Sequence, residues 1–104
     1  MLIPLKKLVR DKIPAMIESN GQAAKTRILD KEAYTRALEK KLKEETHEYL
    51  RSKELVELAD ILEVVDALAA DQGSSFEQIL ELKQKKRQTN GAFDRKIFLV
   101  SVRK

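Results

Sequence analysis

Cysteine is absent from this sequence of 104 residues. That absence excludes disulfide bonds and thiolate metal sites, and it fits a cytoplasmic protein. Aromatic residues are scarce too, with two Tyr, three Phe and no Trp. Because there are only three Gly and two Pro, the chain has too few turn residues for a sandwich or barrel of many short strands.

Long apolar runs are also missing, and no stretch is long enough to span a bilayer. Lys6, Lys7 and Arg10 interrupt the N-terminal region where a signal peptide needs an apolar core. We therefore expect no association with a membrane. The net charge is +4, but the basic residues are mixed with 17 acidic ones. This distribution favours a phosphorylated small molecule over nucleic acid as the partner.

What the chain has in abundance is charged residues (37%) and hydrophobic residues (42%), the balance of a helix-rich protein. The length allows one domain, residues 1–104, with a core that a partner chain completes. Apolar spacing and capping residues predict four helices, at 14–19, 31–51, 53–71 and 75–89. Asp11, Asp30 and Ser74 (the last with Glu77 in a capping box) are the predicted N-terminal caps.

The two ends of the chain read as short extended segments. Residues 96–102, KIFLVSV, are rich in β-branched and aromatic side chains and predict a strand. It is expected to pair with residues 25–29 or with the segment 1–9. The expected fold is all-α, a bundle of about four helices around a central antiparallel hairpin.

Two pairs of acids mark this central hairpin, which turns near Arg51. Glu45 and Glu48 precede the turn, and Glu57 and Asp60 follow it at matching distances. Glu45 and Glu57 fall within the apolar stripes of their helices, with the other two acids at the edges. Because helices joined by a short loop pack antiparallel, the two pairs should meet at one height.

Four carboxylates on a partly apolar seam repel one another and need a counter-charge. Oxygen ligands without Cys, and with one stray histidine, point to Mg²⁺, with Mn²⁺ as an alternative. Two simpler arrangements are also compatible with the pattern: the acids are solvated surface residues, or they pair with basic side chains such as Lys41 and Lys53. Glu63 and Asp66 fall on the polar side and are expected to be surface charges, as is His47.

The pattern Glu44-Glu45-x-x-Glu48 followed by Glu57-x-x-Asp60 resembles the metal signature of the all-α nucleoside triphosphate pyrophosphohydrolases, the MazG-like superfamily. Residues 7–14, KLVRDKIP, and 93–99, FDRKIFL, resemble the phosphoribosyl-ATP pyrophosphohydrolase-like branch. The chain departs from that branch at Gly91-Ala92, where its members often have two glycines. The resemblance covers nearly the whole chain.

The resemblance implies Mg²⁺-dependent hydrolysis between the α and β phosphates of a nucleoside triphosphate, giving a monophosphate and pyrophosphate. It implies Glu45, Glu48, Glu57 and Asp60 as metal ligands, and Glu44 or Glu45 as the group that orients water. It also implies a homodimer or homotetramer. The base and sugar of the substrate are not implied.

Positive charge for the phosphates must come from basic side chains beyond the metal. The candidates are Lys7, Arg10, Lys86 and Arg95, which lie in or beside the segments that carry the resemblance. The competing hypothesis is a non-enzymatic helical module that binds nucleotides, proteins or nucleic acid, with structural acids. A third is an inactive relative that binds nucleotides without cleaving them.

Overall fold

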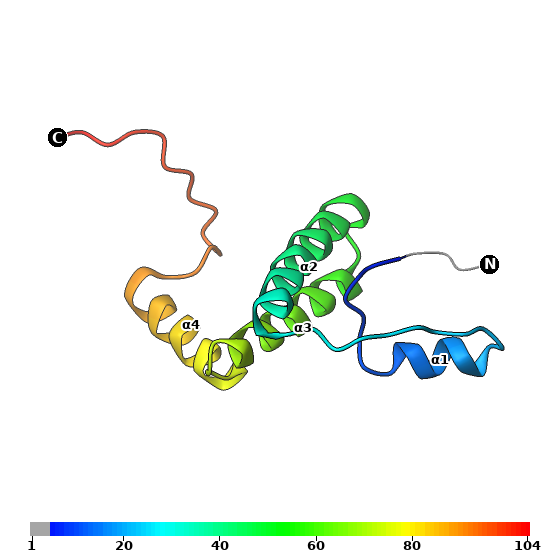
Figure 1. Cartoon of the computed structure of the whole chain (residues 1–104). Coiled ribbons are helices and arrows are strands. Elements are labelled where there is room, and N and C mark those ends of the chain that lie inside the picture. Colours follow the sequence, from blue (N-terminus) through cyan, green and yellow to red (C-terminus); the bar gives the residue numbers. More distant parts are fainter. Residues whose placement is uncertain (1–4) are drawn as a thin grey trace.

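The computed structural model describes residues 5–104, and the regular structure within them is entirely helical. The helices are α1 (Ile13–Ser19), α2 (Lys31–Ser52), α3 (Leu55–Asp71) and α4 (Phe76–Asn90) (Figure 1). The predicted all-α class is therefore confirmed, and each helix boundary lies within two residues of its predicted place. The extended segment predicted at 1–9 lies partly outside the described residues.

The strand predicted at residues 96–102 does not form, so that prediction is wrong for the single chain. The segment is extended, but it runs away from the helices and lies far from residues 25–29 (Figure 1). A β-strand needs a neighbour to accept and donate its backbone hydrogen bonds. No such neighbour lies beside residues 96–102 within the described chain, residues 5–104.

The central hairpin forms as predicted, from α2 and α3. Asp30 caps α2 by accepting a hydrogen bond from the Ala33 backbone N at 2.9 Å. The helix ends at Ser52, and the next residue, Lys53, donates its N–H to the Tyr49 carbonyl at 2.7 Å and has a left-handed backbone (φ 61°) that stops the helix. Only Lys53 and Glu54 separate the helices. A turn this short forces α2 and α3 to pack against each other.

The open end of the hairpin is held by Asp71, the last residue of α3. Its carboxylate accepts hydrogen bonds from Lys31 Nζ and, at 2.6 Å, from Thr35 Oγ1, both on the first turns of α2. The Asp71 side chain is only 5% exposed. The hydrogen bond from Lys31, followed by that from Thr35, lowers the pKa of Asp71. The hairpin is thus fixed at both ends.

Two predicted caps are corrected. Helix α1 begins after Lys12, with no side-chain cap, because Lys12 already has helical dihedral angles and Ile13 N donates to the Arg10 carbonyl. Asp11 therefore caps nothing. Helix α4 begins one residue later than predicted, so Ser75 and not Ser74 accepts the capping bond, from Gln78 N at 3.2 Å.

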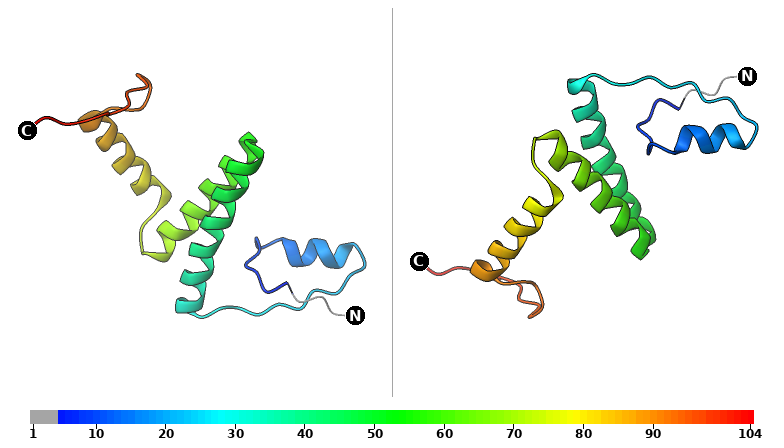
Figure 2. Two further views of the ribbon diagram at one scale, coloured as in Figure 1. Left: turned by 90° about the horizontal axis from the view of Figure 1, so that it is seen from above. Right: turned by 90° about the horizontal axis from the view of Figure 1, so that it is seen from below.

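The four helices do not close into a bundle within one chain. Helix α4 contacts α3 but not α2, and it points away from the hairpin, on the side opposite α1 (Figure 2). Among residues 5–104 only Leu38, Val64 and Ala69 are buried. The radius of gyration is 18.5 Å, against about 13 Å for a compact domain of this length.

Every helix in the described part is too short or too polar to cross a bilayer.

Candidate metal centre

Three of the four predicted acids converge between α2 and α3. Glu45 comes from α2, while Glu57 and Asp60 lie one turn apart on α3, all three half-buried. One carboxylate oxygen from each lies within 4.8 Å of the others. We call these residues the acidic triad. They meet because the two-residue turn sets α2 and α3 at matching heights.

Glu48 lies beside the triad but is engaged elsewhere. Its carboxylate accepts a hydrogen bond from Arg51 Nη2 at 2.7 Å, and this bond lowers the pKa of Glu48. The same contact raises the pKa of Arg51. Arg51 was not among the residues predicted at the site. Its spacing of three from Glu48 on one helix is the signal that identifies the pair.

Glu57 is the acid most affected by this crowding. Burial raises its pKa, and the charges of Asp60, Glu48, Glu45 and Glu54 raise it further. A carboxylate in this position gains from binding a proton or a cation. The triad is therefore an electrostatically unfavourable arrangement that a cation would stabilise.

Two basic side chains neutralise part of the triad. Arg10, from the segment before α1, contacts Asp60 with its Nη2 atom 2.8 Å from Oδ1. Lys41 lies 3.7 Å from Glu45 and 3.9 Å from Glu44. Lys53, considered as a neutralising residue from the sequence, lies instead over the ring of Tyr49. Glu57 has no ion pair of its own within residues 5–104.

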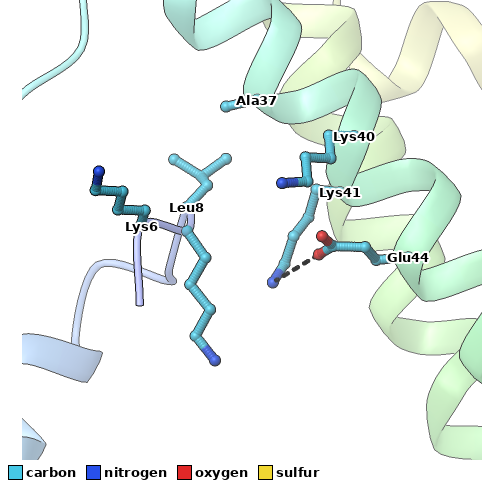
Figure 3. Close-up of a pocket in the computed structure, with 7 residues that line it drawn as sticks. Lys6, Leu8, Ala37, Lys40, Lys41 and Glu44 are labelled. Atoms are coloured by element: carbon cyan, nitrogen blue, oxygen red, sulfur yellow. Dashed lines mark ion pairs between the residues drawn. The ribbon is translucent and has the colours of Figure 1, made fainter. Parts of the chain in front are cut away.

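Glu44 is separated from the triad although it neighbours Glu45 in sequence. It lines a small cavity of 60 Å³ between the N-terminal segment and α2, and Lys7 lines the same cavity. Lys41 also lines this cavity and pairs there with Glu44 (Figure 3), while it lies within 3.7 Å of Glu45 in the triad. The cavity is far smaller than the several hundred Å³ of a typical ligand pocket. Glu44 and Glu45 therefore lie in different surroundings.

The predicted phosphate-binding residues divide into two groups. Lys7 and Arg10 lie beside the hairpin. Lys86 lies on α4 and Arg95 lies beyond it, on the part of the chain that points away from the hairpin (Figures 1 and 2). Arg95 lines an open hollow of 430 Å³ at the end of α4, together with Arg87 and Lys96. Within one chain these two groups do not meet.

The triad offers the oxygen ligands that Mg²⁺ prefers. With bonds of about 2.1 Å, an octahedral Mg²⁺ holds neighbouring oxygens about 3.0 Å apart and opposite oxygens about 4.2 Å apart. The triad oxygens lie within 4.8 Å of one another, so they need to draw closer together to bind one ion. Three carboxylates leave room for waters or phosphate oxygens in an octahedral shell. Glu63, Asp66 and His47, which were predicted to be surface residues, are exposed.

No protein-family model, curated protein or solved structure matches this chain. The functional assignment therefore depends on the residues of the hairpin and their geometry.

Proposed function

We propose that this chain is a Mg²⁺-dependent nucleoside triphosphate pyrophosphohydrolase, which cleaves the α–β phosphoanhydride to a monophosphate and pyrophosphate. The observation that carries the proposal is the acidic triad, three carboxylates within 4.8 Å in a half-buried seam with incomplete neutralisation. The likeness of the two acid motifs and of both flanking segments to the MazG-like superfamily supports it. Mn²⁺ is the alternative ion.

Each residue of the site has a role in the proposed reaction. Glu45, Glu57 and Asp60 would hold the ion, and Glu48 would join them if its hydrogen bond with Arg51 were broken. When bound, Mg²⁺ would supply the charge that polarises the phosphates. Glu45 orients the attacking water and accepts its proton, because it lies in the triad whereas Glu44 faces the neighbouring cavity. The new bond forms between water and phosphorus as the bond to pyrophosphate breaks, with no covalent intermediate.

Basic side chains offset the charge of the leaving pyrophosphate. Arg10, 2.8 Å from Asp60, and Lys7 are the residues of the same chain that lie nearest the site. Lys86 and Arg95 complete the set if a second copy brings them there. We therefore propose a homodimer or homotetramer as the active form, with a nucleoside triphosphate or a related phosphorylated small molecule as substrate.

The test is a screen of nucleoside triphosphates for pyrophosphate release with and without Mg²⁺. Glu57→Ala and Asp60→Ala should each lower the rate by about 100-fold or more, because they remove ligands of the ion that stabilises the transition state. Glu63→Ala, on the exposed side of the same helix, is the matched control and should keep the wild-type rate. Circular dichroism verifies that the helices persist. Full activity in both site variants would exclude the proposal.

A non-enzymatic interaction module is the second candidate, and the many exposed apolar side chains favour it. Thermal melts with Mg²⁺ separate the two. A metal site raises the melting temperature in proportion to its occupancy, whereas a simple adaptor does not respond. The Glu57→Ala variant should lose any such rise.

A further inference from the structure

Charge is segregated along this chain. The hairpin, residues 31–71, contains 11 acidic and 7 basic residues, a net charge of −4. The C-terminal arm, which we define as α4 with residues 91–104, contains 3 acidic and 8 basic residues, a net charge of +5. Two parts of one molecule thus have strong and opposite charges.

Both parts also expose apolar side chains. On α3, Leu55, Leu58 and Leu62 are 81%, 39% and 52% exposed and form one stripe at helical spacing. The buried Val64 lies on the opposite face, toward α2. The stripe is therefore a second apolar surface of α3, which nothing in the described chain covers.

The C-terminal arm has a matching surface. Its exposed apolar residues are Leu80, Leu82, Phe93, Val102 and the run 97–100. Lys86 follows Leu82 by one turn on the same face of α4, and Arg95 lies two residues before the apolar run. The arm therefore presents basic groups next to apolar ones, as the hairpin presents acidic groups next to apolar ones.

These two surfaces do not meet within one chain, because α4 leaves the hairpin at the end of α3 and the arm points outward (Figure 2). The accessible surface is 9942 Å², whereas a compact monomer of this mass exposes roughly 5,900 Å². The excess of about 4,000 Å² per chain exceeds the roughly 1,000–2,500 Å² that each partner contributes to an obligate dimer, so the chain has ample surface for one. Area, charge and apolar character all indicate a partner whose surface resembles the chain's own.

We propose that the C-terminal arm of one copy docks on the hairpin of a second copy, and the reverse, in a two-fold symmetric dimer. A reciprocal exchange closes the assembly, since each copy then has both its surfaces covered. The apolar run of the arm covers the Leu55–Leu58–Leu62 stripe. Lys86 and Arg95 then lie on the acidic side of the hairpin, near the triad of the other copy.

This docking makes the candidate site composite, and that part rests on the proposed function. The triad provides oxygens for a cation, while Arg87, Arg95 and Lys96 surround a hollow large enough for a phosphate chain. The hairpin alone lacks basic groups for the phosphates, and the arm alone lacks ligands for a metal ion. In the dimer, the basic side chains of one copy lie opposite the metal ligands of the other.

The docking is tested by measuring mass with light scattering, at concentrations spanning the dissociation constant. The wild type should reach twice 11.9 kDa. Leu62→Asp on the hairpin and Ile97→Asp on the arm should each weaken the dimer about tenfold or more. Ile28→Asp, at a fully exposed position in the linker before α2, should not. A 1:1 mixture of Leu62→Asp and Ile97→Asp should regain dimers, because the heterodimer keeps one intact junction.

The alternative pairings give different results. If the arms of two copies paired with each other, the Leu62→Asp variant would dimerise like the wild type. If the hairpins paired with each other, the Ile97→Asp variant would dimerise like the wild type. Either result, or a wild type that stays at 11.9 kDa, overturns the proposal. The measured masses test the docking whether or not the wild type hydrolyses a triphosphate. Failure of the docking and failure of the proposed function are therefore distinguishable.

The composite site is tested by mixing Glu57→Gln with Arg95→Ala, each a weak enzyme alone. One site of the heterodimer is then fully intact, and half of a random mixture is heterodimer. The mixture should regain about a quarter of the wild-type rate. Activity no greater than the average of the two variants, in a mixture shown to contain heterodimers, would mean that Arg95 does not serve the triad of the other copy and would overturn the composite site.

Discussion

The α2–α3 hairpin and the C-terminal arm are both rich in apolar and charged residues, yet the residues that are buried among 5–104 all lie in the hairpin. Leu38 on α2 and Val64 on α3 are buried, whereas Leu82, Phe98 and Val100 in the arm are exposed. Both regions begin after short connections, so the difference comes from the direction that each connection gives its helix. The turn at residues 53–54 folds α3 back along α2. The connection at residues 72–75 instead directs α4 away from the hairpin, so α4 contacts α3 but not α2.

The largest effect should come from breaking the hairpin's core. Leu38→Ala removes a 3% exposed side chain and should lower the free energy of unfolding by about 2–5 kcal/mol. Phe98→Ala in the arm should change it by less than about 0.5 kcal/mol in dilute, monomeric protein. Urea unfolding followed by circular dichroism measures both. Equal losses for the two variants in dilute protein would mean that the arm packs within its own chain.

The sequence predicts the structure of the hairpin better than that of the arm. Helical spacing and the Asp30 cap place α2 and α3 to within two residues, because these signals are local. Residues 96–102 have strand-forming side chains but no neighbouring strand, and the sequence does not indicate whether a neighbour exists. Leu58 and Leu62 are apolar but exposed, because α3 is apolar on two faces and periodicity alone does not select the face that meets α2.

The candidate site also has a part that the sequence predicts and a part that it does not. That Glu45, Glu57 and Asp60 share a seam follows from spacing and a short turn. That Glu48 turns to Arg51, and that Arg10 reaches Asp60 from 50 residues away, depends on side-chain geometry and on a long-range contact. The contact between Arg10 and Asp60 is not encoded in a local pattern. The spacing of Glu48 and Arg51 is local, but it does not decide whether Glu48 faces Arg51 or the triad.

A smaller loss of stability is expected at the open end of the hairpin. Asp71→Asn removes the charge that binds Lys31 and Thr35, so the melting temperature at neutral pH should fall, by less than for Leu38→Ala. The hydrogen bonds from Lys31 and Thr35 hold the pKa of Asp71 in the folded chain below that of an Asp in the unfolded chain. The contribution of Asp71 to stability is therefore present above the unfolded pKa and is lost as the pH falls through the folded pKa. Melting curves across this acid range should depend less on pH in the variant than in the wild type.

Removing one charge from the acidic triad should stabilise the metal-free protein, whereas Leu38→Ala and Asp71→Asn destabilise it. Glu57→Gln relieves the repulsion that raises the pKa of Glu57, so the metal-free protein should melt slightly higher than the wild type. The variant should also lose any rise in melting temperature on adding Mg²⁺. Glu63→Gln, exposed on the same helix, is the control and should change neither quantity. A lower melting temperature for Glu57→Gln without metal would mean that the triad does not strain the fold.

The smallest effect is expected from Arg10, which lies in the basic segment before α1 and contacts the hairpin. Arg10 lies 2.8 Å from Asp60, so it occupies a ligand that the proposed Mg²⁺ site requires. Arg10→Gln should therefore bind Mg²⁺ more tightly in the absence of nucleotide, by less than tenfold because the pair is partly exposed. It should also raise the KM for the triphosphate, since Arg10 freed by the ion is available to the phosphates. Lys12→Gln removes an equal charge that makes no ion pair with the hairpin and should change neither constant. Calorimetric titration with Mg²⁺ alone separates the two roles: weaker Mg²⁺ binding by Arg10→Gln would show that Arg10 orients Asp60 for the ion and does not compete with it.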